Sequence, residues 1–173
     1  VVKGDRVIIY MPMIPEAVVA MLACARIGAI HSVVFGGFAS NELASRIDDS
    51  KAKLLVTASC GFEPGRTVEY KPLVDEAINL ANHKINKMIL FQRPGYEVKL
   101  NAPIEVSWDE VVSNASDADC VEMNSNELAY ILYTSGTTGT PKGIVRDIGG
   151  HIVALKWTMK NIYNIDTDDI WWS

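Results

Sequence analysis

The chain has 173 residues, about the length of one domain, and a formal net charge of −5 from 16 basic and 21 acidic side chains. Hydrophobic residues make up 49% of it and charged residues 21%, a mixture that buries a globular core and excludes general disorder. Because the net charge is acidic, nothing attracts the chain as a whole to a polyphosphate backbone, and we expect no nucleic-acid partner.

Other partners and sites are excluded by residue type and spacing. No uncharged stretch is long and apolar enough to cross a bilayer, which takes about 20 residues, so we expect no membrane partner. Cys24, Cys60 and Cys120 have no CxxC spacing and suit no simple disulfide framework, which favours reduced thiols and a cytoplasmic location. The histidines lie too far apart in sequence to form a local metal motif, and we predict no metal ligand.

The first half of the chain alternates apolar strands with helices. In chain order, the pattern predicts a strand at 6–10, a helix at 15–27, a strand at 30–35, a helix at 40–50, a strand at 53–57, a helix at 70–83 and a strand at 87–91. The first helix is apolar all round, which predicts burial, and Ser40 is the expected N-cap of the second. The alternation predicts βαβ units, and therefore an α/β fold with a mainly parallel sheet flanked by helices.

The second half is less regular. We predict a turn-rich segment at 93–101, a short helix at 107–115, a polar loop at 114–126, strands at 128–134 and 143–146, and a helix at 150–163. A strand pattern begins almost at the first residue, and the last residues form an apolar run that contains Trp171 and Trp172. We interpret residues 1–173 as a fragment truncated at both ends, whose uncovered apolar surface favours self-association.

The strongest chemical signal is the run YTSGTTGTPKG at 133–143, directly after an apolar strand. Its glycines allow backbone N–H groups to converge on one anion, its hydroxyl groups add neutral donors, and its lysine adds a point charge that suits phosphate. The predicted phosphate-binding residues are Thr134, Ser135, Gly136, Thr137, Thr138, Gly139 and Lys142.

Two other interpretations of this run compete with a phosphate loop. A plain surface turn rich in Ser, Thr and Gly is one, but it does not require glycines, hydroxyls and a terminal Pro-Lys-Gly together. A Walker A loop is disfavoured, because its second glycine would fall on Pro141 and its Ser or Thr on Gly143.

The run at 133–143 resembles the phosphate-binding signature of the adenylate-forming superfamily, which includes acyl-CoA synthetases, luciferases and peptide-synthetase adenylation domains. The segments MIPEA at 13–17 and ACARIGAIHSVVFGGF at 23–38 look like the short-chain acyl-CoA synthetases. Two further segments favour the propionyl-CoA synthetases, TASCGFEP at 57–64 and KGIVRDIGGH at 142–151. The resemblance covers essentially the whole chain, and implies that it is part of the AMP-binding, large N-terminal domain of such an enzyme.

The resemblance implies an AMP-forming acid–thiol ligase. A short-chain carboxylate, with propionate favoured, attacks the α-phosphorus of MgATP and gives an acyl-adenylate and pyrophosphate; the thiol of coenzyme A then displaces AMP. The phosphate-binding residues would hold the β- and γ-phosphates. In the family the acyl pocket, the Mg-binding region and the catalytic lysine lie downstream of Ser173. We therefore predict no catalytic residue within this chain, and no turnover by the chain alone.

A second ligand site is predicted in the loops after the second and third strands. In a parallel sheet both loops leave from the carboxyl edge, where ligands bind. Resemblance to acetyl-CoA synthetases implies that Gly37 and Arg66 contact the adenosine-phosphate end of coenzyme A. Glu63 stands where the family has another arginine, and would repel the phosphates. Alternatively, Gly37 only turns a tight corner and Arg66 is a solvated loop charge.

The sequence leaves two alternatives to a propionyl-CoA synthetase open. The enzyme could instead be an acetyl-CoA synthetase, which usually carries His-Thr where this chain has Arg146-Asp147. If residues 1–173 are the natural product, the chain could be a non-catalytic nucleotide- or coenzyme-binding module. For Arg146 and Asp147 themselves, we expect a local salt bridge that shapes the exit of the phosphate loop.

Overall fold

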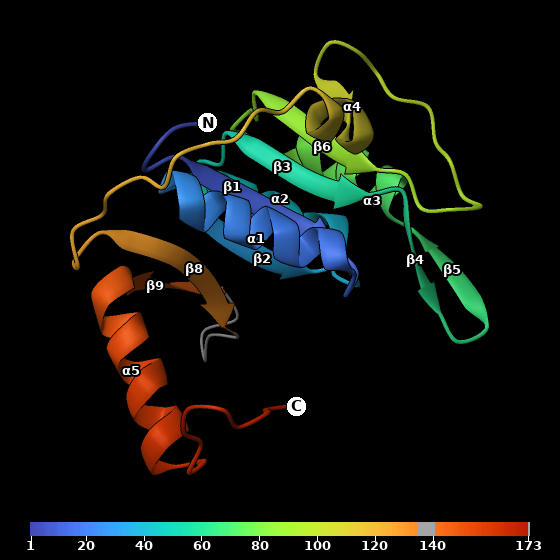
Figure 1. Cartoon of the computed structure of the whole chain (residues 1–173). Helices are drawn as coiled ribbons and strands as arrows, with labels where there is room; N and C mark the ends of the chain where they lie inside the picture. The colour runs from blue at the N-terminus through green and yellow to red at the C-terminus, as the bar shows by residue number, and fades with distance from the viewer. Residues whose placement is uncertain (135–140, 173) are drawn as a thin grey trace.

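The structure is a computed structural model that describes residues 1–134 and 141–172. Within these residues, seven strands form one sheet in the order β7-β6-β3-β1-β2-β8-β9 (Figure 1). The strands are β1 (Arg6–Met11), β2 (Ile30–Phe35), β3 (Leu54–Ala58), β6 (Lys87–Phe91), β7 (Glu105–Ser107), β8 (Leu128–Thr134) and β9 (Lys142–Asp147). Each neighbouring pair is parallel except β8 and β9, which pair antiparallel. The predicted α/β fold with a mainly parallel sheet is therefore confirmed.

Helices cover both faces of the sheet (Figure 1). Helices α1 and α4 lie on the near face in this view, and α2 and α3 lie behind the sheet. The helices are α1 (Pro15–Ile27), α2 (Ser40–Ser50), α3 (Tyr70–Leu80), α4 (Trp108–Ser113) and α5 (Ile148–Asn161). The strand order explains why α1 and α2 lie on opposite faces. The connection from β1 to β2 and the connection from β2 to β3 run in opposite directions across the sheet. Because crossovers between parallel strands are right-handed, opposite directions place their helices on opposite faces.

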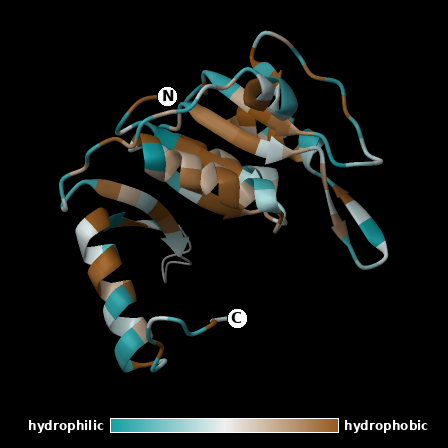
Figure 2. Cartoon of the chain, in the orientation of Figure 1, coloured by the Kyte–Doolittle hydropathy of each residue, from teal (hydrophilic) through white to brown (hydrophobic). Residues whose placement is uncertain are grey.

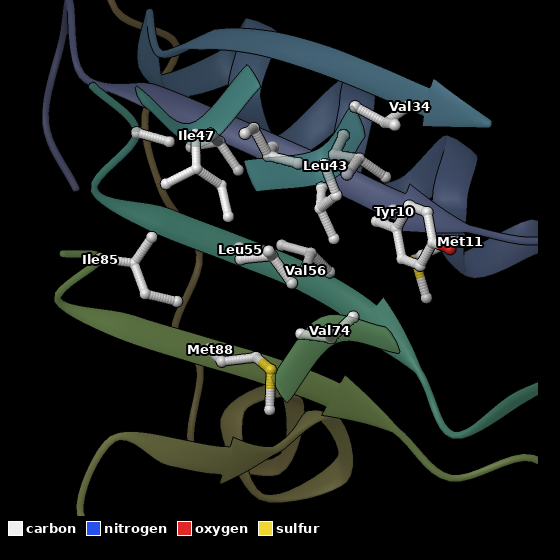
Figure 3. Packing of buried hydrophobic residues seen from close by; sticks show 14 of the residues in the cluster. Tyr10, Met11, Val34, Leu43, Ile47, Leu55, Val56, Val74, Ile85 and Met88 are labelled. Carbon is white, nitrogen blue, oxygen red and sulfur yellow. The ribbon is translucent and has the colours of Figure 1, made fainter. Parts of the chain in front are cut away.

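The main core lies between the central strands and helices α2 and α3. Leu43 and Ile47 from α2 and Val74 from α3 are fully buried and pack with Leu55 and Met88 of the sheet (Figure 3). Leu43 and Ile47 are the residues that the helical periodicity assigns to the inner face of α2. Burying each such side chain contributes about 1.5–3 kcal/mol, so this layer holds helices α2 and α3 on the sheet.

Helix α1 is not buried all round, so that prediction was wrong. It packs on the sheet through the small residues Ala17, Ala20 and Cys24, which are buried. Val18 and Leu22 are 53% and 64% exposed. Figure 2 shows hydrophobic colour on the side of α1 that faces the viewer. Small side chains let the helix sit close to the sheet along a narrow stripe, and that stripe leaves the larger apolar side chains uncovered.

Ser40 is not the N-cap of α2. The N-cap position is Ala39, which has no capping side chain, and the Ser40 hydroxyl donates a hydrogen bond to Glu76 Oε2 at 2.7 Å. Ser40 is buried against α3, so the hydroxyl has a carboxylate partner there in place of the free backbone N–H groups of its own helix. The start of α2 is set by tertiary contact with α3.

The segment at 58–66, expected to be a loop, forms most of a hairpin. Strand β4 (Cys60–Glu63) pairs antiparallel with β5 (Arg66–Glu69), and the hairpin projects beyond the main sheet (Figure 1).

Among the helices in the described part of the chain, none is long and apolar enough to cross a membrane.

Candidate functional site

The flanks of the phosphate motif lie side by side at one end of β8 and β9. Thr134 pairs with Lys142 at the end of the antiparallel register, and both residues are exposed. Thr134 and Lys142 are the two predicted phosphate-binding residues that the structure describes. The others, Ser135, Gly136, Thr137, Thr138 and Gly139, lie outside the described residues.

The phosphate motif and the Gly-Gly-Phe turn lie at the same edge of the sheet. Strand β8 runs parallel to β2, in register at His31 and Tyr130. Thr134 ends β8, and Phe35 ends β2 directly before Gly36 and Gly37. The carboxyl ends of these parallel strands therefore bring the two predicted ligand sites to the edge where open parallel sheets bind ligands.

Tyr133 fixes the start of the phosphate motif to helix α2. Its hydroxyl donates a hydrogen bond to Asp49 Oδ2 at 2.6 Å. Burial, and then the hydrogen bond to Asp49, raise the pKa of Tyr133 above its ordinary value. The phenol is therefore neutral over the physiological pH range and remains a hydrogen-bond donor next to the motif.

The Gly-Gly-Phe turn is closely packed on one side and open on the other. Gly36 is buried, and a β-carbon there would lie 2.2 Å from the Tyr70 hydroxyl oxygen. Gly37 is exposed, and a β-carbon there would lie 2.8 Å from Phe35 Cε1. Only the second glycine therefore presents its backbone to solvent, where a ligand could approach it.

Arg66 lies in the hairpin and is paired with Glu63. Its Nε donates to Glu63 Oε2 at 2.7 Å, and its Nη2 lies 2.6 Å from the same oxygen. The two residues face each other in the β4–β5 register, and the Arg66 side chain is 71% exposed. Glu63 therefore neutralises part of the charge that Arg66 would offer to a phosphate.

Tyr70 joins the hairpin to the Gly-Gly-Phe turn. A β-carbon on Gly61, in β4, would lie 2.7 Å from the same hydroxyl oxygen that crowds Gly36. The base of the hairpin and the turn thus meet at one buried phenol. The structure brings the two segments that carry Gly37 and Arg66 together through this contact.

Arg93 is a basic residue at this edge, at the start of the segment 93–101 that the sequence predicts only as turn-rich. Its guanidinium carbon lies 5.1 Å from the Phe62 ring centroid in the hairpin, and its buried Nε has no hydrogen-bond partner in the described part of the chain. Phe91 ends the parallel strand β6, so Arg93 leaves from the same carboxyl edge. That position after a parallel strand is the signal that could have found it.

Asp147 caps a helix, and the expected salt bridge with Arg146 is not formed among the described residues. Asp147 Oδ1 accepts a hydrogen bond from the Gly150 backbone N–H at the start of α5. A carboxylate there satisfies one of the free N–H groups of the first turn. Asp147, the last residue of β9, therefore also caps the start of α5.

Comparison with known proteins agrees with this geometry. The family model described as "AMP-binding enzyme" matches residues 1–173. The chain belongs to the AMP-binding enzyme family. It is 56% identical over 172 residues to "Acyl-CoA synthetase short-chain family member 3, mitochondrial" of Bos taurus, covering 99% of this chain and 25% of that protein.

Two further relatives extend the comparison. "Acetyl-coenzyme A synthetase" of Shewanella denitrificans is 44% identical over 174 residues, covering 99% of this chain and 27% of that protein. The solved structure of "Acetoacetyl-CoA Synthetase from Streptomyces lividans" matches with a TM-score of 0.86 and 25% identity, covering 98% of this chain and 26% of that one. This family member of 173 residues spans about a quarter of the length of the relatives it matches.

The cytoplasmic location expected from the cysteines is wrong. The bovine relative is named as mitochondrial, and so are its rat and human counterparts. Cys24 and Cys60 are free and buried, and Cys120 is free and exposed. Free thiols indicate a reducing environment, and they do not distinguish one reducing compartment from another.

Proposed function

We propose that this chain is the phosphate- and coenzyme-binding part of an AMP-forming short-chain acyl-CoA synthetase. The observation that carries the proposal is the position of Thr134 and Lys142, paired at the carboxyl edge of a parallel sheet on either side of the phosphate motif. The family match over residues 1–173 and the identity to short-chain acyl-CoA synthetases support it. The protein would be an acid–thiol ligase with ATP, a short-chain carboxylate and coenzyme A as substrates.

The reaction has two halves. The carboxylate oxygen attacks the α-phosphorus, a P–O bond to the β-phosphate breaks, and pyrophosphate leaves. The sulfur of coenzyme A then attacks the acyl carbon, AMP leaves, and a thioester forms. Negative charge develops on oxygen atoms in both steps. Hydrogen-bond donors held in position stabilise this charge in the transition state and contribute much of the rate acceleration.

In the first half-reaction, the motif from Thr134 to Lys142 would hold the β- and γ-phosphates. Thr134 offers a hydroxyl donor at the end of β8, and Lys142 offers a positive charge directly opposite. Ser135, Gly136, Thr137, Thr138 and Gly139 complete the proposed set. Mg²⁺ would neutralise charge on the phosphates. Among residues 1–134 and 141–172, no group of three or more Asp, Glu, His or Cys side chains could hold that ion.

In the second half-reaction, Gly37 and Arg66 would contact the phosphate end of coenzyme A. The exposed backbone of Gly37 and the 71% exposed Arg66 side chain support this assignment. The ion pair with Glu63 must open, or be shared, when Arg66 takes a phosphate. This competition makes the proposed contact of Arg66 weaker than that of an unpaired arginine.

The proposed acid is propionate, because the segments at 57–64 and 142–151 resemble those of propionyl-CoA synthetases. Acetate is the competing acid. The test is pyrophosphate release by the full-length parent with acetate, propionate and butyrate. We expect release with all three to depend on ATP, with propionate giving the highest kcat/KM. Gly139→Val should lower release by well over tenfold, since a branched side chain crowds the phosphates. Undiminished release by Gly139→Val would disprove the phosphate assignment.

We further propose that residues 1–173 are a piece truncated at both ends and are inactive alone. Catalytic groups that act as a unit lose nearly all of the rate when some are missing. The competing function is a non-catalytic nucleotide- or coenzyme-binding module. It is favoured if the natural product has this length, or if the parent binds ATP and releases no pyrophosphate with any of the acids. Sedimentation of the chain alone tests the proposed self-association through its exposed apolar side chains.

A further inference from the structure

Arg46, in helix α2, is a buried cation that the proposed chemistry does not use. Its side chain is only 5% exposed. Its Nη1 donates to Glu42 Oε2 at 2.8 Å and to the Glu42 carbonyl oxygen at 2.6 Å. A buried charge is costly unless it is paired, and this one is held by an acidic partner one turn earlier.

The guanidinium of Arg46 contacts aromatic rings from both predicted ligand loops. Its Cζ lies 4.9 Å from the centroid of the Phe38 ring and 5.3 Å from the centroid of the Tyr133 ring. A planar guanidinium is attracted to the faces of aromatic rings at these separations. Phe38 follows Gly37, and Tyr133 precedes Thr134. One side chain therefore joins the residues next to both proposed sites.

Both rings are also connected to helix α2 in another way. Tyr133 contacts the helix through a hydrogen bond, and Phe38 lies just before it in the chain. Tyr133 donates its hydroxyl to Asp49, three residues after Arg46 on the same face of the helix. Phe38 lies two residues before the start of α2, and its carbonyl oxygen accepts a hydrogen bond from the Tyr10 hydroxyl at 2.7 Å. The Tyr133 hydroxyl and the Phe38 backbone are thus anchored, and the guanidinium contacts both rings.

We propose that Arg46 is a positioning residue that couples the Gly-Gly-Phe turn to the phosphate motif. The inference rests on the proposed function for the identity of the two ligands, but the coupling itself is a property of this chain. Displacing either ring changes the surroundings of the guanidinium and therefore of the other ring. Because such coupling is reciprocal for binding, a ligand held by one segment changes the affinity of the other.

The first test does not depend on activity. Amide hydrogen exchange at 36–40 and at 131–134 is compared in the parent protein and in Arg46→Met, which keeps an apolar side chain of similar length. We expect both segments to exchange faster in Arg46→Met. The matched control is Glu42→Gln, which removes the negative charge of the half-exposed Glu42 but keeps a side-chain oxygen and the main-chain carbonyl as acceptors for Nη1. The guanidinium then stays between the rings, and we expect a clearly smaller change in both segments than in Arg46→Met. Faster exchange in one segment only, in neither, or equally in the control would overturn the proposal.

The second test uses the two half-reactions. Arg46→Met should raise KM for both ATP and coenzyme A by about threefold to thirtyfold, the range expected for lost guanidinium–aromatic contacts. Arg46→Lys should behave like Arg46→Met, because an ammonium lacks the planar face, whereas Glu42→Gln should stay within about twofold of the parent. A change in melting temperature with both KM values unchanged would assign Arg46 a purely structural role. If the unaltered parent releases no pyrophosphate, the proposed function fails, and the exchange experiment alone decides the coupling.

Discussion

The Tyr70 hydroxyl oxygen occupies the space that a side chain on Gly36 would need. A β-carbon at Gly36 would lie 2.2 Å from that oxygen and 2.5 Å from Cζ of the same ring. Tyr70 is only 5% exposed, and its ring packs 5.2 Å from that of Tyr10, so it has little freedom to move. The absence of a side chain at Gly36 is therefore a packing requirement, independent of any ligand.

We predict that Gly36→Ala destabilises the chain by about 1–3 kcal/mol, the usual cost of overpacking a buried site. Gly37→Ala is the matched control. Its nearest contact is the Phe35 ring, which is 64% exposed and can turn away, so we expect a change below about 0.5 kcal/mol. Urea unfolding of the purified chain measures both. Equal effects would show that Tyr70 does not set the requirement.

The ion pair of Arg66 and Glu63 gives a second prediction. In the parent protein Arg66→Ala should raise the apparent KM for coenzyme A by about tenfold at most, because an exposed, already paired guanidinium contributes modestly. Acyl-adenylate formation should be nearly unchanged. Glu63→Gln should move KM in the opposite direction, since it frees the guanidinium for phosphate. If adenylate formation falls together with thioester formation in Arg66→Ala, the residue is structural.

The elements with local signals were the ones that could be predicted. Helix α1 begins at Pro15 and ends before Gly28, whose φ of 70° suits glycine. Proline at the start and glycine after the end are local signals, and the predicted helix has the same bounds, 15–27. The hairpin β4–β5 was missed, because Gly61 interrupts any alternating pattern, and the glycine is there for its close approach to Tyr70. Such an approach joins distant parts of the chain and leaves no local pattern.

The candidate site divides in the same way. The phosphate motif was found because its glycines, hydroxyls and lysine are consecutive in the sequence. Arg46 was not found, because a charged residue in an amphipathic helix is usually solvated. Its burial depends on Phe38 and Tyr133, which lie 8 residues before it and 87 residues after it and come together only in the folded chain.

A buried ion pair between α3 and β7 gives a prediction about stability. Lys71 Nζ lies 3.0 Å from Glu105 Oε1, and both side chains are 8% exposed. It also bonds Asp75, whose side chain is 42% exposed. Burial alone would lower the pKa of Lys71, but the hydrogen bonds to Asp75 and Glu105 outweigh it and raise that pKa. The lysine is therefore charged in the fold at neutral pH.

Lys71→Met should cost about 3 kcal/mol in the free energy of unfolding, because it leaves Glu105 buried without its cation. Adding Glu105→Gln to Lys71→Met should recover much of this loss, since no unpaired charge then remains. Asp75→Asn is the control, and should cost less than about 1 kcal/mol because water already solvates Asp75. Urea unfolding at neutral pH measures all three. A double variant no more stable than Lys71→Met would show that packing, and not the buried charge, dominates.

The buried His31 ring gives a prediction about how the free energy of unfolding changes with pH. The ring stacks on Tyr130 with centroids 5.6 Å apart, and its buried Nδ1 has no hydrogen-bond partner within the described residues. His151 also contacts Tyr130, and its Nδ1 is 3.2 Å from the Tyr130 hydroxyl oxygen. Burial, and then the charge of His151, lower the pKa of His31 below its ordinary value of 6.5. The folded chain therefore favours neutral His31.

The sign of the effect follows from proton binding. Between the lowered pKa of the folded state and about 6.5 in the unfolded state, the unfolded chain binds more protons, so stability falls as the pH falls. We expect the free energy of unfolding to decrease from pH 7.5 to pH 5.5 more steeply in the unaltered chain than in His31→Phe, which keeps the stacking on Tyr130 and removes the titrating group. Tyr130→Phe retains His31 and should retain the steeper decrease. Parallel decreases in the unaltered chain and in His31→Phe, measured by urea unfolding at both pH values, would show that protonation of His31 does not contribute.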